Sequence, residues 1–293
     1  MRAVFLGLNA LGDTLCTTPA IRAFRRKNPE ATIVYVTQSA PFCRVLDGNP
    51  DIDLLLYSER LYFHGIPEPD QVVPWLQTLP IDLRESATLY RLDLRLACQT
   101  MEAFQSHISE TFARLIQVEL ESTRPLIFLD EHDRRAARVF ARRPYVVMSP
   151  HSVSNPDRAD GRGKRKDWPL ERWNEIAARI AATGEFDIYL IGSERDTCID
   201  IDHTRRLHGL SIRTIAALLE EAACVVTVEN GIGHLCAAVN ARAVELYSDL
   251  MPLAWAKPAE GTRMRTLYGD PLEISCDQVW EAFQHFVCAA AAI

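Results

Sequence analysis

The sequence lacks several features that would assign it to a common class of protein. No apolar run reaches the roughly 18 residues of a membrane-spanning helix, and no Cys-x-x-Cys pair occurs among the eight cysteines. Basic residues are not in excess, because 39 acidic side chains outnumber 32 basic ones and the formal net charge is −7. These absences predict a soluble, cytoplasmic protein with reduced thiols, and they argue against nucleic acid as a partner.

Two nucleotide-binding motifs are also missing from the first glycine-containing turn, residues 7–12. The turn is not followed by the Gly-Lys-Ser/Thr of a phosphate loop, and it does not match the Gly-x-Gly-x-x-Gly fingerprint of dinucleotide-binding proteins. Residues 1–8 resemble a short signal peptide, but no small-residue cleavage site closes them and a helical pattern follows at once. We therefore interpret them as the first strand.

The chain of 293 residues predicts two domains, since one hydrophobic core rarely serves such a length, although one large α/β domain is an alternative. The opening reads as strand, turn, helix and strand, which begins a parallel sheet, and this pattern restarts after Pro144. We place one domain at residues 1–143 and a second at residues 144–275. Residues 276–293 are expected to form a helix that crosses back to the first domain.

Asp13 is the first candidate functional residue. It follows a glycine-containing turn at the carboxyl edge of the expected sheet, where parallel sheets bind ligands. The alternative is a helix N-cap, which would stabilise the helix by roughly 1 kcal/mol and have no further role.

Two further segments could bind phosphate. Cations gather just before a predicted helix at residues 164–173, where side chains and helix dipole together would attract an anion, although the segment could also be a flexible basic loop. Residues 228–238 read as a strand, a glycine-rich turn and a small-residue helix, whose backbone amides could cradle a pyrophosphate. His234 could belong to that site or be a core histidine.

Taken in order, these motifs resemble glycosyltransferase family 9, the heptosyltransferases. The resemblance covers residues 1–53 and 145–260, and four motifs carry it: Gly12-Asp13 with Thr18-Pro19-Ala20, Asn49-Pro50-Asp51-Ile52-Asp53, Lys166-Asp167-Trp168-Pro169, and Glu229-Asn230-Gly231-Ile232-Gly233-His234-Leu235. It implies the GT-B fold, two Rossmann-like parallel-sheet domains that face each other across a cleft. The acceptor would bind at the first domain and the nucleotide sugar at the second.

The resemblance also implies an activity, which is inverting transfer of a sugar to an acceptor hydroxyl without a metal or other cofactor. Asp13 would be the general base, and Lys166 would pair with the diphosphate of a donor such as ADP-heptose. The remaining site residues are then expected as follows: Glu229, Asn230, Gly231 and His234 at the donor turn, Glu194 at the ribose, and Gly12, Thr17 and Thr18 on the acceptor side.

The sequence departs from the family pattern at Glu229, where an aspartate is usual, and in the short segment between residues 191 and 207. A non-catalytic sugar-nucleotide-binding or scaffold protein is therefore the alternative, with another nucleotide-dependent enzyme behind it. The acceptor could be a glycan, a protein or a small molecule. Lipopolysaccharide biosynthesis would bring a peripheral contact with the inner membrane, for which the basic residues near Arg134 are the candidates.

Overall fold

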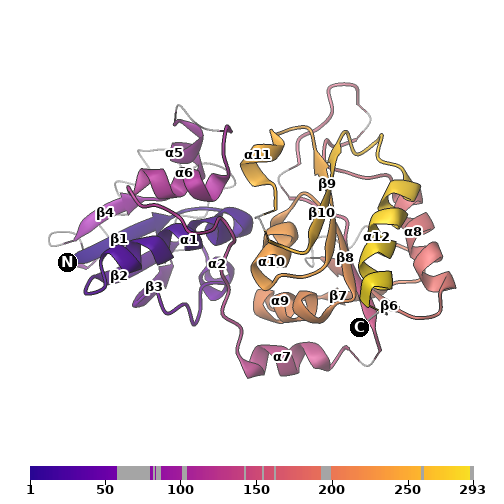
Figure 1. Cartoon of the computed structure of the whole chain (residues 1–293), viewed down its shortest axis with the longest axis horizontal. Coiled ribbons are helices and arrows are strands. Elements are labelled where there is room, and N and C mark those ends of the chain that lie inside the picture. Colours follow the sequence, from indigo (N-terminus) through magenta and orange to yellow (C-terminus); the bar gives the residue numbers. More distant parts are fainter. Residues whose placement is uncertain are drawn as a thin grey trace. The chain divides into compact units, whose positions relative to one another are not determined.

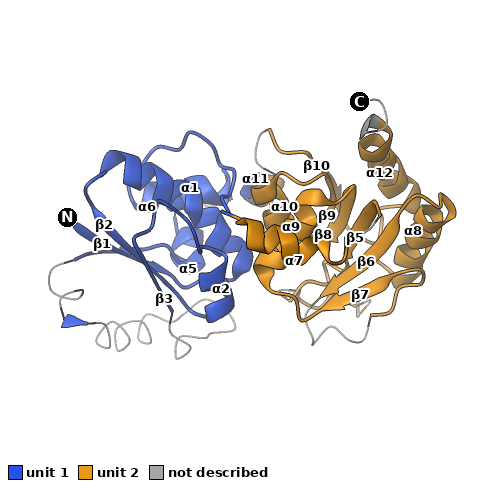
Figure 2. Ribbon diagram, turned by 90° about the horizontal axis from the view of Figure 1, so that it is seen from below, with its two compact units in different colours: residues 1–128, 254–260 blue, residues 129–253, 261–293 orange. Residues whose placement is uncertain are grey.

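The computed structural model describes residues 1–57, 80–81, 83, 87–100, 104–141, 143–153, 155–161, 163–192, 199–258 and 261–290. The chain forms two compact units (Figures 1 and 2). Unit 1 contains residues 1–128 and 254–260, and unit 2 contains residues 129–253 and 261–293.

Unit 1 is built on a four-stranded parallel sheet with the order β3-β2-β1-β4. The strands and helices are β1 (Arg2–Gly7), α1 (Leu11–Lys27), β2 (Thr32–Thr37), α2 (Ala40–Arg44), β3 (Leu54–Tyr57), β4 (Thr88–Arg91), α5 (Leu94–Cys98) and α6 (Ile108–Leu115). The two central strands, β1 and β2, are almost entirely buried, as expected of apolar parallel strands covered on both faces. Helix α1 packs against α6, and Phe24 of α1 contacts Phe5 and Tyr90 of the sheet.

Unit 2 is built on a six-stranded parallel sheet with the order β10-β9-β8-β5-β6-β7. Its elements are α7 (Glu131–Arg138), β5 (Tyr145–Ser149), α8 (Leu170–Ala182), β6 (Asp187–Gly192), β7 (Arg205–His208), α9 (Ile212–Glu221), β8 (Cys224–Val228), α10 (Gly231–Val239), β9 (Ala243–Ser248), β10 (Met264–Gly269) and α12 (Cys276–Ala290). The short helix α11 (Leu253–Ala256) lies where the chain passes from unit 2 to unit 1.

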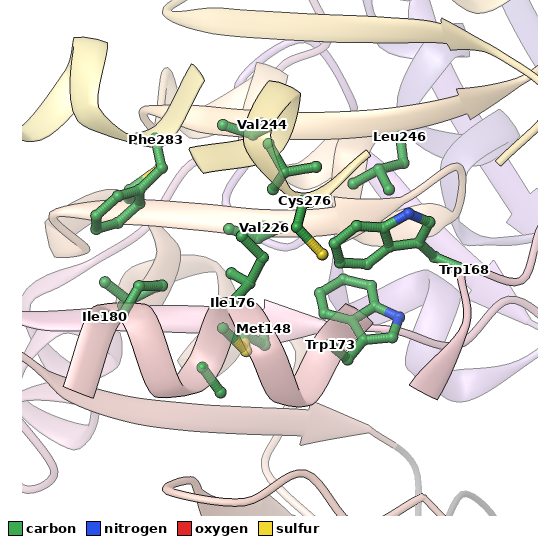
Figure 3. Packing of buried hydrophobic residues seen from close by; sticks show 14 of the residues in the cluster. Met148, Trp168, Trp173, Ile176, Ile180, Val226, Val244, Leu246, Cys276 and Phe283 are labelled. Carbon is green, nitrogen blue, oxygen red and sulfur yellow. The ribbon is translucent and has the colours of Figure 1, made fainter. Parts of the chain in front are cut away.

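The main hydrophobic cluster of unit 2 lies between the sheet and helices α8 and α12. In Figure 3, Trp173, Ile176 and Ile180 follow one face of α8 toward Val226 and its neighbours on the sheet. The Trp168 and Trp173 rings meet edge to face with their centroids 5.1 Å apart. The helical spacing of these residues in the sequence predicts this face of α8 correctly.

The division between the units precedes the predicted boundary at residues 143 and 144. Helix α7 packs on α9 of unit 2, because Arg213 donates two hydrogen bonds to Asp133, at 3.1 and 2.5 Å, and Arg134 donates to Glu220 at 2.8 Å. The sequence places α7 before the new strand pattern, which is why it was assigned to the first domain. Its packing assigns it to the second.

The C-terminal helix also differs from the expectation that it crosses back to the first domain. Helix α12 packs against α8, β8, β9 and β10, and Val279 and Phe283 are buried in the unit 2 cluster. The segment that returns to unit 1 is residues 254–260. Its Trp255 is buried and its ring lies 4.7 Å from that of Phe104.

We expect Arg213→Met to lower the free energy of unfolding by about 3 kcal/mol or more, because it leaves Asp133 buried without its cation. The matched control is Arg205→Met, which removes an exposed guanidinium 3.7 Å from Asp187 and should cost less than about 1 kcal/mol. Denaturant unfolding of the full chain measures both. Equal small losses would contradict the assignment of α7 to unit 2 through this ion pair.

Candidate functional site

The side chain of Asn230 organises the carboxyl edge of the second sheet. As the N-cap of α10, its Oδ1 accepts hydrogen bonds from the amides of Ile232 and Gly233, at 2.8 and 3.3 Å. Its Nδ2 donates to Ser149 Oγ at 3.1 Å and to the carbonyl oxygen of His151 at 2.8 Å. Asn230 is expected to bind the donor. In the structure its side-chain amide makes hydrogen bonds that join the ends of β5 and β8 to the start of α10.

Lys166 and Glu229 form an ion pair beside this N-cap. Lys166 Nζ lies 2.7 Å from Glu229 Oε1, and the side chains are only 11% and 12% exposed. Glu229 Oε2 accepts a hydrogen bond from Ser248 Oγ at 2.8 Å, and the amide of Lys166 donates to Asn155 Oδ1 at 2.8 Å. Glu229, which stands where the family usually has an aspartate, therefore contacts Lys166 directly, and Lys166 is the residue predicted to pair with the diphosphate.

Other basic residues near Lys166, namely Arg158, Lys164 and Arg165, are held by contacts within unit 2. An antiparallel bridge joins Asp157 and Lys164. Arg158, which is almost fully buried, donates to both carboxylate oxygens of Asp270, and these hydrogen bonds lower the pKa of Asp270 to about 2. Arg165 donates to Asp249 at 2.5 Å. Arg158 and Arg165 are thus both paired with carboxylates of unit 2.

A third titratable group, Glu245, lies near the Lys166–Glu229 pair, and sequence reasoning does not identify it. It stands on β9, and only 5% of its surface is exposed. A Cβ atom built on Gly233 would lie 2.0 Å from Glu245 Oε1, so the absence of a side chain at Gly233 makes room for this carboxyl group. Burial, reinforced by the charge of Glu229 and opposed by that of Lys166, raises the pKa of Glu245 to about 8.

The remaining donor-side residues are placed only in part. Gly231 is the first residue of α10, and His234 lies in the first turn of that helix with its side chain half-buried. Glu194 lies outside the described residues. A sequence signal for Glu245 did exist, because it is the only charged residue in the apolar segment Ala243 to Ser248.

Asp13 lies in the first turn of α1, in unit 1, and is partly exposed. The N-cap of that helix is Ala10, which makes no side-chain cap, so the interpretation of Asp13 as an N-cap is wrong. Its charge contributes, after burial, to raising the pKa values of the Cys98 thiol and the Tyr35 hydroxyl. Asp13 is therefore an acid at the carboxyl edge of the first sheet that is not needed to cap its own helix.

Thr17 and Thr18, expected on the acceptor side, are fully buried. Thr17 Oγ1 donates to the carbonyl oxygen of Thr14 at 2.7 Å and lies 2.7 Å from the Tyr35 hydroxyl. Thr18 Oγ1 donates to the carbonyl oxygen of Leu15 and accepts from the amide of Leu126. Both hydroxyls are thus used inside unit 1, and Gly12, which is also buried, can offer a ligand its backbone alone.

The described residues contain no group of three or more His, Cys, Asp or Glu side chains that could hold a metal ion. Among the same residues, no helix is both long enough and apolar enough to span a membrane.

Comparisons with known proteins agree with these two sheets and their motifs. The sequence signature of glycosyltransferase family 9 (heptosyltransferase) matches residues 94–268, more than half of the chain, and the chain belongs to this family. It is therefore a glycosyltransferase. A comparison with curated protein sequences found no significant match.

Solved structures share its fold over nearly the whole chain. A glycosyl transferase family 9 protein from Veillonella parvula DSM 2008 is 17% identical, with 98% of this chain and 97% of that chain covered and a TM-score of 0.73. The ADP-heptose lps heptosyltransferase II of E. coli is 16% identical, with 99% and 100% covered and a TM-score of 0.74. The E. coli heptosyltransferase WaaC with ADP is 17% identical, with 98% and 100% covered and a TM-score of 0.65. The fold is the GT-B fold.

We expect Gly233→Ala to destabilise the protein by about 1–3 kcal/mol, because the new Cβ meets the Glu245 carboxyl group. In a Glu245→Ala background the same change should instead stabilise α10 by about 0.5–1 kcal/mol, since alanine favours a helix over glycine. A double-mutant cycle of unfolding free energies measures the difference. Additive effects would show that the two residues do not share this space.

Glu245 also gives stability a defined pH dependence. Its carboxyl group keeps a proton up to about pH 8 in the native state but has an ordinary pKa of 4.5 when unfolded. The native state therefore binds more protons in this range, and the free energy of unfolding falls as the pH rises from 4.5 to 8.

We expect Glu245→Gln to remove up to about 1.4 kcal/mol of this fall per pH unit. Urea unfolding of the wild type and the variant between pH 5 and 8 tests it, with the exposed Glu185→Gln as a control that keeps the wild-type slope. Parallel curves for the wild type and Glu245→Gln would contradict the buried, protonated state.

Proposed function

We propose that the protein transfers a sugar from a nucleotide-diphosphate donor, ADP-heptose, to an acceptor hydroxyl with inversion and without a metal ion. The observation that carries this proposal is the Lys166–Glu229 ion pair at the carboxyl edge of the second sheet. Family membership supplies the reaction class. The choice of donor is supported by the similarity to the E. coli ADP-heptose lps heptosyltransferase II and to the E. coli heptosyltransferase WaaC with ADP.

Lys166 is suited to a diphosphate because it is fixed before any ligand binds. Its backbone amide is held by Asn155 and its ammonium group by Glu229. The nearby first turn of α10 adds the positive end of a helix dipole. A diphosphate that shares the ammonium group with Glu229 would therefore bind a cation that is already oriented, which lowers the entropy cost of binding.

In the proposed reaction, the acceptor oxygen attacks the anomeric carbon as the bond from that carbon to the diphosphate oxygen breaks. The acceptor hydroxyl gives its proton to the carboxylate of Asp13, and Lys166 balances the negative charge that develops on the diphosphate. Asp13 is partly exposed and lies in the first turn of α1, at the carboxyl edge of the first sheet, which supports this role.

The acceptor is proposed only as a hydroxyl-bearing glycan, protein or small molecule. Arg134 and Arg138, the residues expected to meet an anionic acceptor or the inner membrane, form ion pairs with Glu220 and Glu221. These pairs offset the charge on which that expectation was based. A role in lipopolysaccharide biosynthesis is therefore supported by the family alone.

We expect Asp13→Asn to lower the turnover of ADP-heptose in the presence of an acceptor by about 10²–10⁴ while leaving the affinity for ADP unchanged. Lys166→Ala should instead weaken ADP binding at least tenfold.

The controls are Asp47→Asn in unit 1 and Lys164→Ala, whose ammonium group pairs with Asp157 at 3.0 Å. Calorimetric titration and a transfer assay separate the two effects. Full activity of Asp13→Asn would refute its role as the base.

A further inference from the structure

Glu245 lies on the α10 face of the second sheet. Its partners in the strand register are Thr227 on β8 and Thr266 on β10. The neighbouring Val244 and Leu246 belong to the hydrophobic cluster on the opposite face, so alternation along the strand directs Glu245 toward α10. There the carboxyl group occupies the space that Gly233 leaves open in the first turn of the helix.

The charged and titratable groups around Glu245 come from every element packed on it. Glu229 follows β8 and Lys166 precedes α8, and both act on Glu245 electrostatically. Helix α10 contributes the buried thiol of Cys236, whose pKa is raised by burial and by Glu245, and it also carries His234. The register neighbours Thr227 and Thr266 carry no charge, and Thr266 Oγ1 has no hydrogen-bond partner among the described residues.

Glu229 thus contacts the Lys166 ammonium group directly, and Glu245 acts on both charges electrostatically. With Glu245 neutral, the charges of Lys166 and Glu229 cancel, and the helix dipole leaves the site favourable to an anion. With Glu245 ionised, the three side chains sum to one negative charge in a nearly buried site, where a nearby diphosphate is strongly repelled.

We infer that Glu245 is a positioning residue of the donor site, whose neutral form leaves Lys166 with a single carboxylate so that a nucleotide diphosphate binds, and whose ionised form opposes that binding. This inference rests on the proposed function, because it places the diphosphate at Lys166. It adds a coupling that the activity itself does not require: the nucleotide binds together with a proton held on Glu245.

The test is the affinity for ADP, measured by calorimetric titration of the full chain between pH 7.5 and 9.0. This window lies above the ordinary titration of terminal phosphate groups, so ADP keeps a constant charge. The raised pKa of Glu245, about 8, falls inside it. We expect the dissociation constant of the wild type to rise five- to tenfold across the window.

Glu245→Gln keeps the shape of the neutral carboxyl group and cannot ionise. We expect its dissociation constant to change less than twofold across the window and to match the wild-type value at pH 7.5. Glu185→Gln, which neutralises an exposed carboxylate after α8, should retain the full pH dependence. A variant that had merely lost structure would bind weakly at every pH.

The two proposals fail in different ways. ADP binding that weakens equally with pH in the wild type and Glu245→Gln would overturn the role of Glu245, while loss of binding in Lys166→Ala would still support the proposed function. Absence of ADP binding at every pH would overturn both.

Discussion

The hydrogen bonds of one half-buried amide side chain, that of Asn230, connect the elements at the carboxyl edge of the second sheet. Asn230 joins the ends of β5 and β8 to the start of α10, and the position of Glu229 beside Lys166 follows from that connection. An amide suits this task because it donates and accepts at once without adding a charge next to the Lys166–Glu229 ion pair. Substitution by aspartate would keep the cap but remove both donors.

The first sheet has a corresponding residue. Asn9 follows β1, accepts a hydrogen bond from the amide of Leu94 at 2.8 Å and donates to the carbonyl oxygen of Leu92 at 2.6 Å, while Gln38 donates to its backbone carbonyl. Each sheet therefore fixes the loops at its carboxyl edge with an asparagine placed directly after a central strand. The charged residues proposed for chemistry, Asp13 and Lys166, lie close in sequence or space to these fixed points.

Much of the fold and part of the site could be predicted from the sequence, because alternating strands and helices and four short motifs are local patterns. Other features depend on tertiary contacts. Residues 90–118 suggest one helix, yet Thr88–Arg91 pairs with β1 as an edge strand. Helix α7 is polar and packs on α9 through ion pairs, so its sequence has no apolar face from which that packing could be predicted. The sequence does not show that the hydroxyls of Thr17 and Thr18 are used in hydrogen bonds within unit 1. It also cannot show that Glu245 lies against Gly233, because the two residues are brought together only by the packing of α10 on the sheet.

The return of residues 254–260 to unit 1 has a consequence for how the chain is made. Trp255 packs against Phe104 there, and burial lowers the pKa of His107 to about 4, although a hydrogen bond with the Lys257 backbone opposes this shift. On a ribosome, the first 128 residues emerge long before this segment is synthesised. Phe104 therefore cannot pack against Trp255 until most of unit 2 has been translated, so the last contacts of unit 1 form late in synthesis.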